Sequence, residues 1–133
     1  MFTIATITIA GDVLVESHED KPESLLPILY RLIDCQMVEC RDLVGAGMTA
    51  WFDEEGLYSD HNEVNLLATA ICEAHRQSNG RIGFVGNAVF TGLPDREGET
   101  TGLDEGQIRY IQQAAADMSI TISTLRAEYS TPE

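Results

Sequence analysis

The chain has 133 residues, of which 22 are Asp or Glu and 8 are Lys or Arg, so its formal net charge is −14. This charge argues against direct nucleic-acid binding, because Lys and Arg must neutralise the phosphates there, and it disfavours anionic membrane surfaces. No apolar run approaches the roughly 18 residues that a membrane span needs, and no secretory leader follows Met1. We therefore expect a cytoplasmic protein that binds no membrane.

A length of 133 residues is typical of one domain that buries enough surface to fold without a metal or a disulfide. We expect this domain to cover residues 1–126 and the tail over 127–133 to fray. Cys35, Cys40 and Cys72 leave one thiol unpaired in any disulfide scheme. Three reduced, partly buried thiols are therefore expected, as in cytoplasmic proteins.

The first elements predict a β-hairpin. Residues 3–10 are rich in Ile and Thr, the Gly-Asp pair at 11–12 is a two-residue turn signal, and 13–15 read as the returning strand. The alternation of apolar and polar residues slips near Ala5, which indicates a bulge or a strand covered on both faces. We expect the polar residues 16–23 to connect this hairpin to a helix.

A helix and a second hairpin are expected next. Ser24 predicts the N-cap of a helix that runs to about Asp34, with Pro27 in the first turn, where its missing N–H costs little. Residues 36–43 and 48–52 predict two strands, and two glycines between them predict the turn.

The middle of the chain predicts a helix and a strand. Asp60 with Glu63 three residues later forms a capping-box pattern, which predicts the start of a helix that ends at the Asn-Gly pair of 79–80. Residues 82–90 predict the last strand, although it contains two glycines.

The last elements are a loop and a helix. Residues 92–102 are rich in Gly, Pro and acids and predict a loop, and Asp104 with Gln107 predicts the cap of a helix to about Met118. Residues 120–125 fit a strand or a helix. The whole pattern predicts an α+β fold, a small and mainly antiparallel sheet with two to three helices packed on it.

The acidic stretch AWFDEEGLYSDHNEVN, residues 50–65, raises the question of a metal site or a catalytic acid pair. An EF-hand loop with Gly56 at its sixth position would place Trp51 at the first, and tryptophan cannot bind calcium. The carboxylates of residues 53–55 crowd a turn, where water solvates all three alike. We predict no metal and no catalytic residue here, while a calcium site of another type stays open.

Two further patterns carry little specificity. Cys72 and His75 form a Cys-x-x-His pair on one helical face, but a zinc site needs four ligands. The glycines at 80, 83 and 86 are spaced like a phosphate loop, but no Gly-Lys-Ser/Thr follows. We therefore expect no cofactor, and the sequence leans against an enzyme.

Three stretches in combination resemble a known family: WFDEEGL at 51–57, Asn65 with the Ala-Thr pair of 68–69, and GNAVFTG at 86–92. The chain is similar to a family of small phage- and plasmid-encoded proteins catalogued only as a domain of unknown function. In that family a hairpin and a helix precede a strand with an acidic turn, a helix that opens near Asn, and a glycine-bounded strand. The resemblance implies this order of elements and a bacteriophage or other mobile-element origin, hence a place in the host cytoplasm.

The likeness covers residues 2–103, and two departures stand out. Asp34-Cys35-Gln36 occupies the place of two glycines that usually follow the first helix, and the final helix is an addition. The family brings no established catalytic residues, so none is carried over.

The leading hypothesis is a non-enzymatic, acidic interaction protein that binds a host protein or acts on a host defence system. An acidic surface steers association with a basic partner and can occlude the basic groove of a nucleic-acid enzyme. Tryptophan is a frequent anchor in protein interfaces. The expected partner-binding residues are Trp51, Asp53, Glu54, Glu55, Asp60 and Glu63.

The alternative hypothesis is a protein that binds and sequesters a small molecule or nucleotide. Its expected ligand-binding residues are Arg76, Arg81 and Asn87, because arginine holds phosphate groups and the glycine-containing strand nearby offers backbone N–H groups. The sequence is also compatible with a homo-oligomer.

Overall fold

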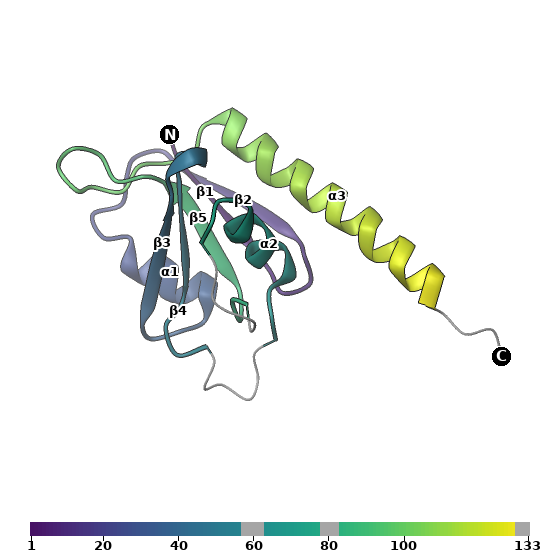
Figure 1. Ribbon diagram of the computed structural model, residues 1–133. Coiled ribbons are helices and arrows are strands. Elements are labelled where there is room, and N and C mark those ends of the chain that lie inside the picture. The colour runs from purple at the N-terminus through teal and green to yellow at the C-terminus, as the bar shows by residue number, and fades with distance from the viewer. Residues whose placement is uncertain (57–62, 78–82, 130–133) are drawn as a thin grey trace.

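The computed structural model describes residues 1–56, 63–77 and 83–129, and for residues 122–129 the description is of the backbone. The expected α+β class is confirmed by one five-stranded sheet and three helices (Figure 1). In chain order the elements are β1 (Phe2–Ile7), β2 (Val13–His18), α1 (Leu26–Ile33), β3 (Val38–Leu43), the 3-10 turn η1 (Val44–Ala46), β4 (Met48–Asp53), α2 (Leu66–Ala74), β5 (Ala88–Gly92) and α3 (Glu105–Tyr129).

The sheet is antiparallel throughout, in the order β2-β1-β5-β4-β3. β5, the last strand in the sequence, lies between the two hairpins and joins them. All six residues of β1 are buried and pair in regular register with β2. The irregular alternation near Ala5 therefore reflects a strand covered on both faces and not a bulge.

The two faces of the sheet carry different helices, and each has its own apolar cluster (Figure 1). Leu29 and Ile33 of α1 pack on one face, against Phe2, Ile4 and Val89. On the other face α2 and the first half of α3 cover the larger cluster, in which the rings of Phe52 and Phe84 stack with centroids 4.0 Å apart. The sheet is thus a central layer between helices.

The first hairpin and α1 differ from the expectation in two details. β2 continues to His18, because residues 16–18 pair with residues 2–4 of β1 where a connection was expected. α1 begins at Leu26 after Leu25, and its N-cap makes no side-chain hydrogen bond. The predicted Ser24 cap is therefore wrong, whereas Pro27 lies in the first turn as predicted.

α2 begins later than predicted, because a different residue caps it. Asn65 is the N-cap, and its side-chain oxygen accepts a hydrogen bond from the N–H of Ala68 at 3.0 Å. Glu63 precedes the helix, so the predicted Asp60–Glu63 cap is wrong, and Asp60 itself lies outside the described residues. α2 ends at Ala74, and the Asn-Gly pair expected to end it also lies outside the described residues.

β5 begins at Ala88, six residues after the predicted start of this strand. Gly83 and Gly86 have φ angles of +79° and +84°, which an extended strand does not contain. Between them Val85 forms an isolated antiparallel bridge with Val64. This short segment therefore pairs with the residues before α2 and enters the sheet only from Ala88.

α3 is capped as predicted but is longer. The Gln107 N–H donates to Asp104 Oδ1 at 2.8 Å, and the Asp104 N–H donates to Gln107 Oε1 at 2.9 Å, which makes a reciprocal capping box. The helix then runs for 25 residues to Tyr129. Residues 120–125 are therefore helical, as are residues 127–129 of the expected tail.

Candidate functional site

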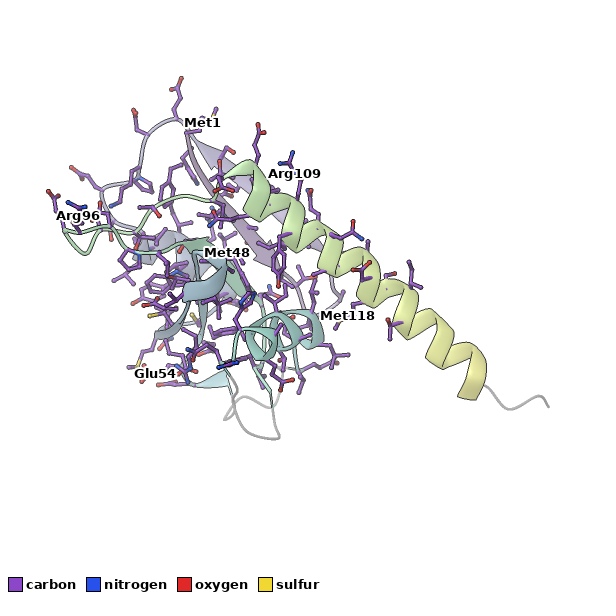
Figure 2. All side chains as sticks on the ribbon, turned by 45° about the horizontal axis from the view of Figure 1, so that its top comes forward. Met1, Met48, Glu54, Arg96, Arg109 and Met118 are labelled. Carbon is purple, nitrogen blue, oxygen red and sulfur yellow. The ribbon has the colours of Figure 1, made fainter. Side chains whose placement is uncertain are left out.

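Four carboxylates lie near one another at the end of the molecule where α1 and β4 finish; we call Asp34, Asp53, Glu54 and Glu55 the acidic end. Asp34 is the C-cap of α1, in the left-handed conformation with φ of +60°, and Asp53 is the last residue of β4. The Glu54 N–H donates to Met37 O at 3.0 Å, which holds this turn against the start of β3. Glu54 and Met1 lie at opposite ends of the sheet (Figure 2).

Two of these carboxylates, Asp34 and Asp53, lie close enough to the Cys35 thiol to raise its pKa. Burial raises its pKa to about 11, and the negative charges of Asp53 and Asp34 add to that effect. Two acids separated by 19 positions in the sequence therefore act on the same thiol. Asp53 was predicted from the sequence as a partner-binding residue, whereas Asp34 was not, because only the fold brings α1 and β4 together.

The negative charge of the acidic end is not neutralised within the described part of the chain. Among the described residues, the ion pairs of Lys and Arg join Lys21 to Glu99, Arg31 to Glu16 and Arg41 to Glu39, and none includes a carboxylate of the acidic end. Glu54 and Glu55 are exposed, and Asp53 Oδ1 accepts a hydrogen bond from the Glu55 N–H at 2.9 Å. Within the described residues no three His, Cys, Asp or Glu side chains gather closely enough to hold a metal ion.

The other predicted partner-binding residues are arranged differently. Trp51 is half-buried, packs on the cluster beneath α1, and donates its indole N–H to Thr91 Oγ1 at 3.0 Å. Part of the Trp51 side chain therefore belongs to the core, and the rest of it is accessible. Glu63 is exposed before α2, and Asp60 lies outside the described residues.

Of the predicted ligand-binding residues, the two that the structure describes, Arg76 and Asn87, serve different parts of the fold. Arg76 is exposed just after α2, with φ of +63°, on the side of the sheet that α2 covers. Asn87 instead uses its amide to join the first hairpin to α1, because its oxygen accepts from the Ile9 N–H and its nitrogen donates to Leu32 O, both at 3.3 Å. Arg81 lies outside the described residues.

A pocket that the sequence did not indicate lies where η1, the end of α2 and the first turns of α3 meet. Its volume is about 340 Å³, and its lining residues are Gly45, Ala46, Met48, His75, Asp104, Gly106, Gln107 and Tyr110. Gln107 Nε2 donates to the carbonyl oxygens of Ala46 and Gly47 at 3.2 and 2.8 Å, so one side chain fixes η1 against α3.

The polar groups of this pocket are a hydrogen-bonded pair and a capping carboxylate. His75 Nε2 and the Tyr110 hydroxyl are 2.9 Å apart, and the two rings meet edge to face. Asp104 accepts from the Gln107 N–H and is committed to the helix cap. The pocket thus offers a ligand an aromatic wall and two groups that donate or accept hydrogen bonds.

The fold and the acidic end define a small α+β protein with a carboxylate-rich surface, and within the described residues no helix is both long and apolar enough to cross a bilayer. The chain belongs to the family described as "Domain of unknown function (DUF3846)", whose profile matches residues 6–116. The resemblance found in the sequence is therefore confirmed, and the match continues beyond residue 103 into α3. No curated protein and no solved structure matches the chain.

Proposed function

We propose that this chain is a non-enzymatic interaction protein that binds a basic surface of another protein through its acidic end. The observation that supports the proposal is the clustering of Asp34, Asp53, Glu54 and Glu55, which no described Lys or Arg neutralises. The chain carries a net charge of −14, so the field of the whole molecule adds to this local charge. Such a field accelerates encounter with a positive surface and weakens as salt is added.

The proposed partner is a host protein, and the proposed origin of the chain is a bacteriophage or another mobile element. A basic groove that normally contacts nucleic acid suits this surface, because carboxylates on a rigid sheet end present negative charge much as phosphates do. Backbone structure holds the main chain of Asp34 at the C-cap of α1 and that of Asp53 at the end of β4. A preorganised surface loses less entropy on binding.

The test uses two variants that remove the same number of charges. One neutralises the acidic end (D34N, D53N, E54Q, E55Q), and the matched control neutralises four other exposed acids (E19Q, D20N, E23Q, E97Q). Proteins captured from a bacterial lysate by each tagged variant are compared by quantitative mass spectrometry, and the association rate of the main captured protein is measured at low and high salt. Loss of that protein with the first variant alone supports the proposal. Equal capture by both variants contradicts it.

The pocket beside η1 favours a second candidate, a small-molecule-binding protein. Its volume of about 340 Å³ lies within the range of ligand pockets, and His75 and Tyr110 supply hydrogen-bonding groups at its wall. Native mass spectrometry of protein purified from cells tests this function. A bound small molecule that disappears in the H75A variant supports it, and an unliganded mass for the wild type contradicts it.

A further inference from the structure

An apolar groove runs between α2 and α3 on the face of the sheet opposite α1. Its volume is about 310 Å³. Most of its lining is apolar, from Leu67, Ala70, Ile71 and Ala74 of α2 and from Ala114 and Met118 of α3, and Tyr110, Asp117 and Thr121 of α3 add polar groups. Small alanine side chains form part of the groove on both helices, and helices approach one another most closely where the contacting side chains are small. The groove therefore has the shape that accepts another helix.

α3 is longer than the surface that it covers. Among the α3 side chains that the structure describes, which end at residue 121, the last one that packs on the core is Met118, and Ile120 is 68% exposed. The helix continues to Tyr129, about 16 Å beyond Met118 at 1.5 Å per residue. Both views show this half of α3 extending past α2 and away from the sheet (Figures 1 and 2).

The sequence of the extending half continues an apolar repeat that begins on the core. Ile108, Ile111, Ala115 and Met118 are spaced by three, four and three residues and pack on the larger apolar cluster. The sequence continues this spacing with Ile122, Leu125 and Tyr129. Alternate spacings of three and four residues mark a helix that packs along another helix. The first four residues of this repeat pack on the core of the same chain.

The local composition agrees with a helix that needs a partner. Residues 119–124 are Ser-Ile-Thr-Ile-Ser-Thr, all of them modest helix formers, and three or four turns of helix are marginal alone in water. Packing against a second helix or strand supplies the stability that the weak helix propensity of these residues does not provide.

The charge of residues 118–127 indicates which kind of partner this part of α3 binds. Residues 118–127 contain no acid and one base, Arg126, in a chain whose net charge is −14. Two copies of so acidic a chain repel one another over most of their surfaces, and a segment without acids adds nothing to that repulsion. Its one base, Arg126, has the opposite charge to Asp117 of the groove. The neutral segment also lies beyond residue 116, where the family match ends.

We propose that two copies of this chain associate through these segments, with residues 119–129 of each α3 lying in the α2–α3 groove of the other copy. Such a contact is isologous, since the same groove and the same helix end are contributed twice around a two-fold axis. It uses a different surface from the acidic end and leaves those carboxylates exposed.

The first test compares two alanine-to-glutamate variants of the full chain by sedimentation equilibrium. Ala74 lines the groove, whereas Ala116 does not, and both are exposed helical residues. Urea unfolding of each variant measures the intrinsic cost of glutamate, which is larger at Ala74 because it is the last residue of α2. Burying a second carboxylate in the groove, which already contains Asp117, should raise the dimer dissociation constant by about tenfold or more for A74E. For A116E it should stay within about twofold of wild type.

The second test mixes variants of the two contacting parts. L125E alters the helix end, A74E alters the groove, and circular dichroism checks that both remain folded. Each variant alone should be monomeric, whereas a mixture should regain association, because an unaltered helix end then meets an unaltered groove in one of the two contacts. A monomeric wild type, equal effects of A74E and A116E, no recovery on mixing, or a small molecule found in the groove by native mass spectrometry would each overturn the proposal.

Discussion

The side-chain nitrogen of Asn65 donates a hydrogen bond to the main-chain oxygen of Ile7 at 2.9 Å, across 58 positions of sequence. The same nitrogen donates to Gly86 O at 2.9 Å, and the side-chain oxygen accepts from the Ala68 N–H at 3.0 Å. Asn65 is completely buried. One amide therefore ties the end of β1, the segment before β5 and the start of α2 to one another.

Replacing Asn65 by alanine should lower the free energy of unfolding by about 2–4 kcal/mol, because the helix loses its cap and two buried carbonyl oxygens lose a donor. Urea unfolding followed by circular dichroism measures the change. Asn87→Ala is the control: its two hydrogen bonds are 3.3 Å long and partly exposed, so the loss should be about 1 kcal/mol or less. If both variants lose the same free energy of unfolding, the buried Asn65 amide contributes no more stability than the partly exposed Asn87 amide.

Asn65 also illustrates which helix and strand boundaries can be predicted from the local sequence and which cannot. The Asp104–Gln107 cap is a local pattern, since both partners lie within one turn, and it is present as predicted. The true cap of α2 depends on Ile7 and Gly86, which no local window around Asn65 contains. The late start of β5 has a similar cause, because Val85 pairs with Val64 and not with the sheet.

The candidate site was predictable to a similar extent. Residues 53–55 are consecutive, so their charge is visible in the sequence, whereas Asp34 joins them only through the packing of α1 beside β4. The pocket beside η1 combines residues 45, 75 and 107, and its groups gain significance only in the folded chain. The surroundings of Trp51 could not be predicted from the sequence, because its burial depends on packing beneath α1 and its indole N–H donates to Thr91, 40 positions away.

The contact between Gly47 and Gln107 predicts a second stability effect. A Cβ atom at Gly47 would lie 2.9 Å from Gln107 Nε2, and φ at this glycine is +68°. Gly47→Ala should destabilise the protein by about 1–2 kcal/mol for the backbone and about 1 kcal/mol more for the displaced Gln107 hydrogen bonds. Thermal and urea unfolding report the sum.

The control for this variant is Gly98→Ala. Gly98 has a similar φ of +81°, but nothing lies within 4 Å of its added Cβ. It should therefore show the backbone cost alone. If the two variants lose the same free energy, Gln107 moves aside without cost and does not fix η1.

The ion pair beside α1 predicts a shifted carboxyl titration. Burial raises the pKa of Glu16, but hydrogen bonds from His18 and Arg31 outweigh it, so the pKa lies below its ordinary value of 4.5. Because the folded-state pKa is lowered, the stability from this group is present above pH 4.5 and is lost as the pH falls through the folded-state pKa. Arg31→Met should move the Glu16 pKa upward in a carbon-13 NMR titration. Arg76→Met, which removes an arginine outside this ion pair, should leave it in place.

The three cysteines should react with iodoacetamide in an order set by their surroundings. Cys72 is completely buried in the larger cluster, and burial raises its pKa to about 12. Cys40 is exposed. Since the thiolate is the reactive form, labelling of the native protein at about pH 8 should proceed from Cys40 to Cys35 and last to Cys72, with all three labelled in denaturant. Peptide mass spectrometry over time gives the three rates.

The same burial makes a pH prediction for stability. A thiol whose pKa is raised on folding contributes stability that is fully present below its ordinary pKa of 9.0 and is lost as the pH rises through the folded-state value of about 12. The free energy of unfolding should therefore fall across this alkaline range, and less steeply in Cys72→Ala, where no thiol must ionise. Native labelling of Cys72 as fast as that of Cys40 would contradict both parts, because it would require α2 to open readily from the sheet.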